Sequence, residues 1–226
     1  MTSSFIRKAG VIACLVVCGG CAQVALVSVT PMIAALARHF DRATADRIVE
    51  LEQQKNWDEM LKLAQVQLQR EPERAEWWVL QGYAQERLGQ PAVAVLSYQQ
   101  ATRLSPEDEG AWLALGRSES ALGRPEQAIQ AYRQALRYRP ESAQAYLALA
   151  ELYLQQGQPD LALPNYRESL RYDPELEQAW YGLASAYQRT GQNERRDEAL
   201  KGLRRLDPAA ADQFEKQYRL KQAKQR

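Results

Sequence analysis

The chain has 226 residues, and its 29 Lys and Arg against 28 Asp and Glu give a formal net charge of +1. A balance this close to neutrality does not predict binding to nucleic acid. All three cysteines lie in the first 21 residues, which excludes disulfides and thiolate metal sites from the rest of the chain.

The first element in chain order is an export signal. Two basic residues precede an uninterrupted apolar or small stretch, residues 9–17, and Gly19-Gly20 stands directly before Cys21. A basic start, a short apolar stretch and small residues at a cleavage point are typical of such signals. The segment resembles the signal of bacterial lipoproteins, in which two small residues precede the cysteine that is lipidated.

The lipoprotein resemblance implies that residues 1–21 form the signal and that cleavage leaves Cys21 as the new N-terminus. Acyl chains on the Cys21 sulfur would then hold the protein in a membrane. The next residue is Ala22, and not the Asp that keeps lipoproteins in the inner membrane. The resemblance therefore implies an outer-membrane lipoprotein that faces the periplasm, although Cys18 stands where that family prefers Leu.

The same region also fits an uncleaved anchor. Residues 9–29 form a mostly apolar stretch of 21 residues, which is long enough to cross a bilayer as a helix. An inner-membrane signal anchor would leave the basic start in the cytoplasm and export the remainder. We expect residues 22–40 to form an apolar membrane-proximal segment. Its residues 24–37 would lie on the membrane or cover the first repeat.

From residue 41 the chain repeats every 34 residues. Proline recurs at this interval as Pro72, Pro106, Pro140, Pro174 and Pro208, and glycine as Gly89, Gly123, Gly157 and Gly191. Two helix-stopping residue types that share one period indicate stacked copies of one helical hairpin. The copies are residues 41–74, 75–108, 109–142, 143–176 and 177–210, of which the first is degenerate.

Fixed positions within the copies carry a family resemblance. Most copies have an aromatic residue at positions four and twenty-four and a small residue at positions eight and twenty. The third copy reads Trp112, Leu115, Gly116, Ala128, Tyr132, Ala135 and Pro140. This resembles the tetratricopeptide repeat (TPR) family over residues 41–210. The resemblance implies an all-α fold, a right-handed superhelical solenoid of antiparallel helix pairs.

Departures from the pattern predict where the hairpins differ. Glycine at position fifteen suits the left-handed turn that ends the first helix of a hairpin. The first copy has Lys55-Asn56 there, and Asn is an acceptable turn residue. Arg196 replaces a small residue in the last copy, so we expect its second helix to be looser or more exposed. Residues 211–226 are expected to form a capping helix and a basic tail, with a packing face of Ala210, Phe214, Tyr218 and Leu220.

No pattern in the chain predicts catalysis. His39 is the only histidine and precedes the repeats, so the repeats contain no histidine dyad. Glutamates fall at positions typical of solvated helix faces. The spacing of Cys14, Cys18 and Cys21 resembles an iron–sulfur motif of radical SAM enzymes, but an export segment does not supply such a site. We therefore expect a protein that is not an enzyme, with no cofactor, no metal and no small-molecule substrate.

The TPR resemblance implies a concave groove lined by the first helix of each hairpin. Position five forms an apolar row flanked by charged residues, which suits an extended peptide or helix with spaced apolar anchors. The predicted partner-binding residues are Val79, Tyr83, Glu86, Arg87, Leu113, Arg117, Leu147, Glu151, Leu154, Tyr181, Gln188 and Arg189. The alternative is that these side chains partly pack between neighbouring helices.

The combined features predict a lipid-anchored, non-enzymatic scaffold or adaptor that faces the periplasm. It would bind protein partners and help to assemble an envelope complex such as pilus, secretion or cell-wall machinery. The alternative function is a structural or assembly subunit of a membrane complex, held in the inner membrane by an N-terminal helix.

Overall fold

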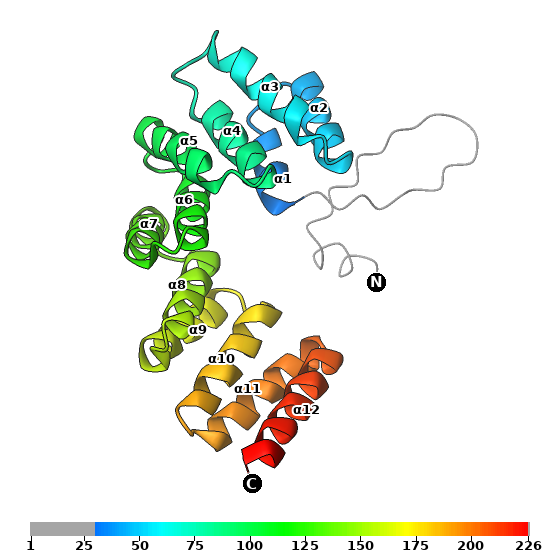
Figure 1. The fold of residues 1–226 in the computed structure, drawn as a ribbon, viewed down its shortest axis with the longest axis vertical. Coiled ribbons are helices and arrows are strands. Elements are labelled where there is room, and N and C mark those ends of the chain that lie inside the picture. The colour runs from blue at the N-terminus through cyan, green and yellow to red at the C-terminus, as the bar shows by residue number, and fades with distance from the viewer. Residues whose placement is uncertain (1–29, 226) are drawn as a thin grey trace, which may run out of the picture. The chain divides into compact units, whose positions relative to one another are not determined.

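Helical hairpins make up the described part of the chain, residues 30–225 of a computed structural model, with side chains described as far as Gln217 (Figure 1). Within these residues the secondary structure is helical throughout, as the repeat pattern predicts. The described residues form two compact units, which divide between Pro106 and Glu107. The signal segment, Cys21 and most of the proposed anchor lie outside the described residues.

Residues 30–106, the described part of the first unit, contain five helices. They are α1 (Pro31–Ala37), α2 (Arg42–Gln53), α3 (Trp57–Leu68), α4 (Ala75–Arg87) and α5 (Pro91–Leu104). The pairs α2–α3 and α4–α5 are hairpins, and α1 packs on α2. Ile33 and Leu36 of α1 are buried. The described part of residues 24–37 therefore covers the first repeat, one of the two placements expected from the sequence.

Residues 107–225, the described part of the second unit, contain seven helices. They are α6 (Glu109–Ala121), α7 (Pro125–Tyr138), α8 (Ala143–Gln155), α9 (Pro159–Tyr172), α10 (Glu177–Arg189), α11 (Asn193–Leu206) and α12 (Pro208–Gln225). The pairs α6–α7, α8–α9 and α10–α11 are hairpins, and α12 packs on α10 and α11. The predicted capping helix is therefore present, one helix after the last hairpin.

The turns inside the hairpins follow the repeat pattern with one exception. Gly89, Gly123, Gly157 and Gly191 have φ values of +69° to +74°. In the first hairpin Lys55 takes this conformation, with φ of 53°. The expectation that Asn56 is the turn residue is wrong, because Asn56 instead caps α3 by accepting a hydrogen bond from the Glu59 backbone N–H at 3.3 Å.

Small residues let aromatic rings pack closely between the helices of a hairpin. A Cβ atom on Gly82 would lie 2.7 Å from Cε1 of Tyr98, and one on Gly116 would lie 2.4 Å from Cε1 of Tyr132. Separations this short are not compatible with an unshifted ring. The glycine at position eight therefore makes room for the tyrosine at position twenty-four.

The last hairpin and the capping helix can be compared with what the sequence predicts. The Arg196 side chain is only 11% exposed, and its guanidinium donates hydrogen bonds to Asn193 and Asp197. Arg196 itself is poorly exposed, because a long aliphatic stem can be buried while the charged head reaches polar partners. The helix as a whole, α11, has three buried residues against four in α7 and five in α9, which agrees with the expectation of a more exposed second helix. On α12, Ala211 and Phe214 are buried and Ala210 is half-buried. The side chains of Tyr218 and Leu220 lie outside the described residues.

Candidate protein-binding surface

The predicted groove residues divide into three groups by exposure. Val79, Tyr83, Leu147 and Leu154 are buried, with 3%, 5%, 7% and 8% of their surface exposed. Glu86, Leu113 and Gln188 are half-buried, and Arg87, Arg117, Glu151, Tyr181 and Arg189 are exposed. For the four buried residues, burial favours the alternative expected from the sequence, that they pack between neighbouring helices; the binding role of the set stays a prediction. These four side chains pack between helices and offer almost no surface to a ligand.

In the first unit, the groove positions are engaged by the unit's own residues. The Tyr83 hydroxyl lies 2.8 Å from both carboxylate oxygens of Glu52 and donates to that carboxylate. Burial raises the pKa of Tyr83 to about 12, so it remains a neutral donor at physiological pH. The guanidinium of Arg87 lies 4.8 Å from the ring centre of Trp57. These two predicted residues thus stabilise the stacking of α2–α3 on α4.

The sequence-based prediction did not include Glu52, a buried carboxylate on α2. Glu52 stands at position twelve of the first repeat, and Tyr83 stands at position nine of the second. A carboxylate and a tyrosine at these positions of consecutive repeats are the signal from which the contact could be predicted.

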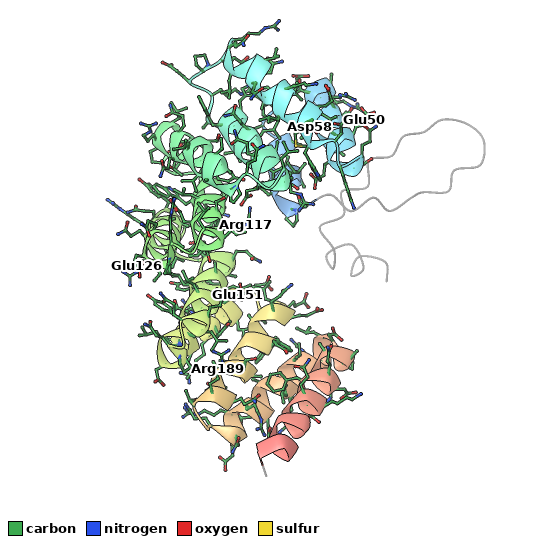
Figure 2. All side chains as sticks on the ribbon, viewed as in Figure 1. Glu50, Asp58, Arg117, Glu126, Glu151 and Arg189 are labelled. Carbon is green, nitrogen blue, oxygen red and sulfur yellow. The ribbon has the colours of Figure 1, made fainter. Side chains whose placement is uncertain are left out.

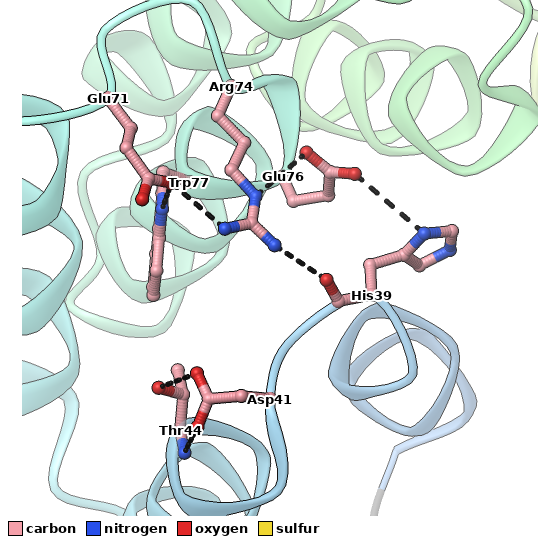
Figure 3. Close-up of polar contacts among 7 residues, drawn as sticks. All are labelled: His39, Asp41, Thr44, Glu71, Arg74, Glu76 and Trp77. Carbon is pink, nitrogen blue, oxygen red and sulfur yellow. Dashed lines mark hydrogen bonds and ion pairs between the residues drawn. The ribbon is translucent and has the colours of Figure 1, made fainter.

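Arg74 fixes the N-terminal segment to the first unit (Figure 3). Its Nη2 donates to the His39 carbonyl oxygen at 2.6 Å, and its Nη1 donates to Glu71 Oε2 at 2.9 Å. The guanidinium also lies 4.8 Å from the ring centre of Phe40, and that ring packs against Trp77 at a centroid distance of 4.2 Å. The segment that joins α1 to α2 is therefore held by both polar and aromatic contacts.

The second unit carries four of the five exposed residues of the predicted groove, all except Arg87 (Figure 2). Arg117 lies on α6, Glu151 on α8, and Tyr181 and Arg189 on α10. Tyr181 is 38% exposed and its ring meets Phe214 of the capping helix edge-on at 5.2 Å. The first helices of three consecutive hairpins thus present a mixed aromatic and charged surface.

Arginine–tyrosine hydrogen bonds join the second helix of one hairpin to the first helix of the next at two places in the second unit. Arg133 Nη2 of α7 donates to the Tyr153 hydroxyl of α8 at 3.3 Å. Arg167 of α9 repeats the contact one hairpin later and donates to the Tyr187 hydroxyl of α10 from Nε at 3.0 Å and from Nη2 at 2.8 Å. The sequence-based prediction omitted these residues, although both pairs share a spacing of 20 residues.

Glu151 is the unusual charge on this surface. It is exposed, yet burial by the surrounding protein raises the pKa of its carboxyl. The residues on either side of it on the same face of α8, Leu147 and Leu154, are apolar. Glu151 has no ion pair or hydrogen bond with any described residue. An incompletely hydrated carboxylate without a partner is a candidate binding group.

Comparison with protein families decides the identity of the repeats. A family model described as tetratricopeptide repeat matches residues 37–109 and 113–163, which is more than half of the chain. The chain belongs to the tetratricopeptide repeat family. Two further TPR models match residues 152–191 and 177–209, so the TPR matches extend to the last hairpin.

Solved structures share the TPR fold at low sequence identity. MamA from Desulfovibrio magneticus RS-1 matches with a TM-score of 0.64 at 19% identity, over 75% of this chain and 97% of that one. TTC0263 from Thermus thermophilus has a TM-score of 0.58 at 21% identity, over 73% and 90% of the two chains. YrrB has a TM-score of 0.58 at 18% identity, over 67% and 78%. These likenesses show the fold alone. No curated protein matches the chain in sequence.

The TPR fold is typical of non-enzymatic protein-interaction scaffolds. Among the described residues, no group of three or more His, Cys, Asp or Glu could hold a metal ion. No helix within residues 30–225 has the length and apolar character needed to cross a bilayer. The candidate site is the surface of α6, α8 and α10, because Arg117, Glu151, Tyr181 and Arg189 are exposed there on successive first helices.

Proposed function

We propose that this TPR protein is a non-enzymatic scaffold that binds a protein ligand along α6, α8 and α10. The observation that carries the proposal is the exposure of charged and aromatic groove residues on three successive first helices of the second unit, whereas the exposed groove residue of the first unit, Arg87, lies over the ring of Trp57. In the first unit Val79 and Tyr83 are buried. In the second unit Arg117, Glu151 and Tyr181 are exposed on successive first helices. A TPR protein with the same fold, YrrB, is described as having an unusual peptide-binding site.

The proposed ligand is an extended peptide or a helix that meets a few apolar side chains and several charges. Tyr181 supplies a ring that is partly exposed and is held in place by Phe214. Aromatic anchors surrounded by charges are typical of protein-binding surfaces. Because Leu147 and Leu154 are buried, they would form the floor beneath a ligand and would not be anchors themselves.

Site-specific photo-crosslinking tests the proposed surface. A photoreactive phenylalanine derivative replaces Tyr181 or Arg117 in the full-length chain, and the matched control carries it at Glu126, an exposed residue on α7. We expect one discrete partner to be crosslinked from positions 181 and 117 and none from 126. Crosslinking from position 126 alone would refute the proposal for this surface.

We also propose that the scaffold is a lipoprotein that faces the periplasm and takes part in an envelope complex. Cys21 lies outside the described residues, and the support for this step is the signal-like N-terminal sequence. Metabolic labelling with palmitate is expected to mark the wild-type chain and not the Cys21→Ala variant. An unlabelled, unprocessed chain in the inner membrane would instead favour the signal-anchored alternative.

A further inference from the structure

The segment of residues 30–40 lies along one face of α4. Glu76, Val79 and Tyr83 are spaced three and four residues apart on this helix, so their side chains share that face. Val79 and Tyr83 belong to the predicted groove, and Tyr83 donates a hydrogen bond to the carboxylate of Glu52 on α2. We name this face, together with Glu52, the first-unit groove.

Both ends of the segment contact the first-unit groove. At the start of the segment, the Thr30 hydroxyl oxygen lies 3.4 Å from that of Tyr83. At its end, His39 Nδ1 lies 3.7 Å from Oε1 of Glu76 (Figure 3). Tyr83 follows Glu76 by seven residues, a rise of about 10 Å along a helix. The helix α1 also has seven residues, so the segment matches this face in length and runs antiparallel to α4.

Three apolar side chains hold the segment on the first unit. Ile33 and Leu36 stand three residues apart on one face of α1 and are 0% and 6% exposed. Four residues later, the ring of Phe40 packs against Trp77 at a centroid distance of 4.2 Å. Arg74 Nη2 donates at 2.6 Å to the backbone carbonyl oxygen of the residue before Phe40. Apolar residues on one face of a helix are also how a helical ligand binds in a groove.

The helix α1 has little stability of its own. Isolated helices shorter than about 12 residues are marginal in water, and α1 has seven. Thr30 at its N-cap makes no capping hydrogen bond with its side chain, and no charged residue in the first or last turn complements the helix dipole. We therefore expect α1 to be helical only while it packs on the first unit.

We propose that residues 30–40 are an internal ligand of the first-unit groove, and that a helical segment of a partner protein with the same pattern displaces them. The pattern is two apolar residues three apart, followed four residues later by an aromatic residue. Arg74 would donate to a backbone carbonyl oxygen of the partner, as it does to the internal segment. The first-unit groove lies in the first unit, so its refutation would leave the proposal for α6, α8 and α10 unchanged.

The internal segment competes with any such partner. It is joined directly to α2, because Phe40 precedes Asp41, the N-cap residue of that helix. An attached ligand has an effective concentration in the millimolar range. A partner must therefore bind more tightly than the free segment would, or be held nearby. Removing the apolar anchors of the segment should make the first-unit groove bind such helices more tightly.

The probe that tests this inference is the acetylated and amidated peptide of residues 30–40. It is titrated into two full-length chains in detergent micelles, the wild type and a release variant that carries Ile33→Asp, Leu36→Asp and Phe40→Ser. Both chains are labelled with ¹⁵N at tryptophan, and the indole N–H resonance of Trp77 is followed because the Trp77 ring contacts Phe40. We expect a saturable shift in the release variant, and binding at least about tenfold weaker in the wild type.

Matched variants locate the peptide in the first-unit groove. Arg74→Ala, added to the release variant, removes a charged donor and should weaken peptide binding about tenfold. Arg70→Ala is the control, because Arg70 is an exposed arginine that also lies between α3 and α4, and it should leave binding unchanged. A peptide with Ile33→Asp and Leu36→Asp should not bind. Equal affinity for the wild type and the release variant, an equal effect of the two arginine substitutions, or a folded release variant without a saturable shift would overturn the inference.

Circular dichroism at 222 nm checks that the release variant is folded. If it is not folded, the wild-type chain alone decides. Binding of the peptide in the groove raises the population in which α1 is released. Unlabelled peptide at millimolar concentration should therefore speed amide hydrogen exchange in α1 of the ¹⁵N-labelled chain at least about threefold, and the aspartate-containing peptide should not. Unchanged exchange in α1 would refute the assignment of the segment as an internal ligand.

Discussion

Replacing two equivalent tyrosines by phenylalanine gives a direct test of the hydrogen-bond assignments. Tyr98 donates to Glu86 at 2.9 Å, whereas Tyr166 has no partner among the described residues. Both rings are almost fully buried, at 0% and 1% exposed. The substitution Tyr→Phe removes one oxygen atom and retains the ring, so packing is preserved in both variants.

The expected magnitudes differ between the two sites. A hydrogen bond to a charged group contributes about 1.5–3 kcal/mol. Glu86 is half-buried and regains part of this from water, so Tyr98→Phe should lower the free energy of unfolding by about 1–2 kcal/mol. Tyr166→Phe removes a hydroxyl with no bond to lose, and the change should stay within about 0.5 kcal/mol.

Thermal unfolding followed by circular dichroism at 222 nm is the assay. For a chain of this size, the loss in Tyr98→Phe corresponds to a decrease in Tm of about 2–8 °C. Tyr138→Phe is the control, because the Tyr138 side chain is 43% exposed. A decrease in Tyr166→Phe as large as that in Tyr98→Phe would refute the reasoning, since it would mean that the Tyr166 hydroxyl already has a partner in the free protein.

Three further predictions concern local features. Lys55→Gly should raise the free energy of unfolding by about 1 kcal/mol, because Lys55 has a φ of 53° and left-handed backbone is unfavourable for a residue with a side chain. Chemical denaturation measures this free energy, and a decrease would contradict the prediction. Arg74→Ala removes the hydrogen bond to the His39 carbonyl. Backbone amide hydrogen exchange in α1 should become at least about threefold faster, as expected if the free energy of local opening falls by about 0.6 kcal/mol or more. Unchanged exchange would show that the contact does not hold the segment. The pKa of Glu151 is raised from 4.5, so the folded state binds the proton more tightly than the unfolded state. The wild type should therefore lose stability relative to Glu151→Gln as the pH rises above about 4.5, and a stability difference that does not change with pH would show that folding does not shift the pKa of this carboxyl.

The period of the sequence predicted the helices because turns require particular residues. Glycine at position fifteen, as at Gly123, takes the left-handed conformation that ends the first helix. Proline two residues later, as at Pro125, fits the first turn of the second helix. These are local requirements of the backbone, so they can be recognised without knowing what surrounds them.

The exposure of the predicted groove residues could be foreseen only in part, because position in a repeat does not determine exposure. Leu147 and Tyr181 occupy the same position in consecutive repeats, yet Leu147 is 7% exposed and Tyr181 is 38% exposed. In the final hairpin Tyr181 meets the capping helix edge-on through Phe214 and keeps an open side. Exposure depends on which residues neighbouring helices place alongside, and these come from other repeats.

The amino-acid sequence by itself determined the repeat length, the hairpins, their turns and the family, because each depends on residues close together in the chain. Tertiary structure alone decided that Tyr83 pairs with Glu52, that the segment before α2 docks on Arg74, and that the ring of Tyr166 packs against Gly182 of the next hairpin. The physical reason is that hydrogen bonds and burial depend on distances between side chains of different hairpins. A one-dimensional pattern fixes the order of those side chains but not the distances between them.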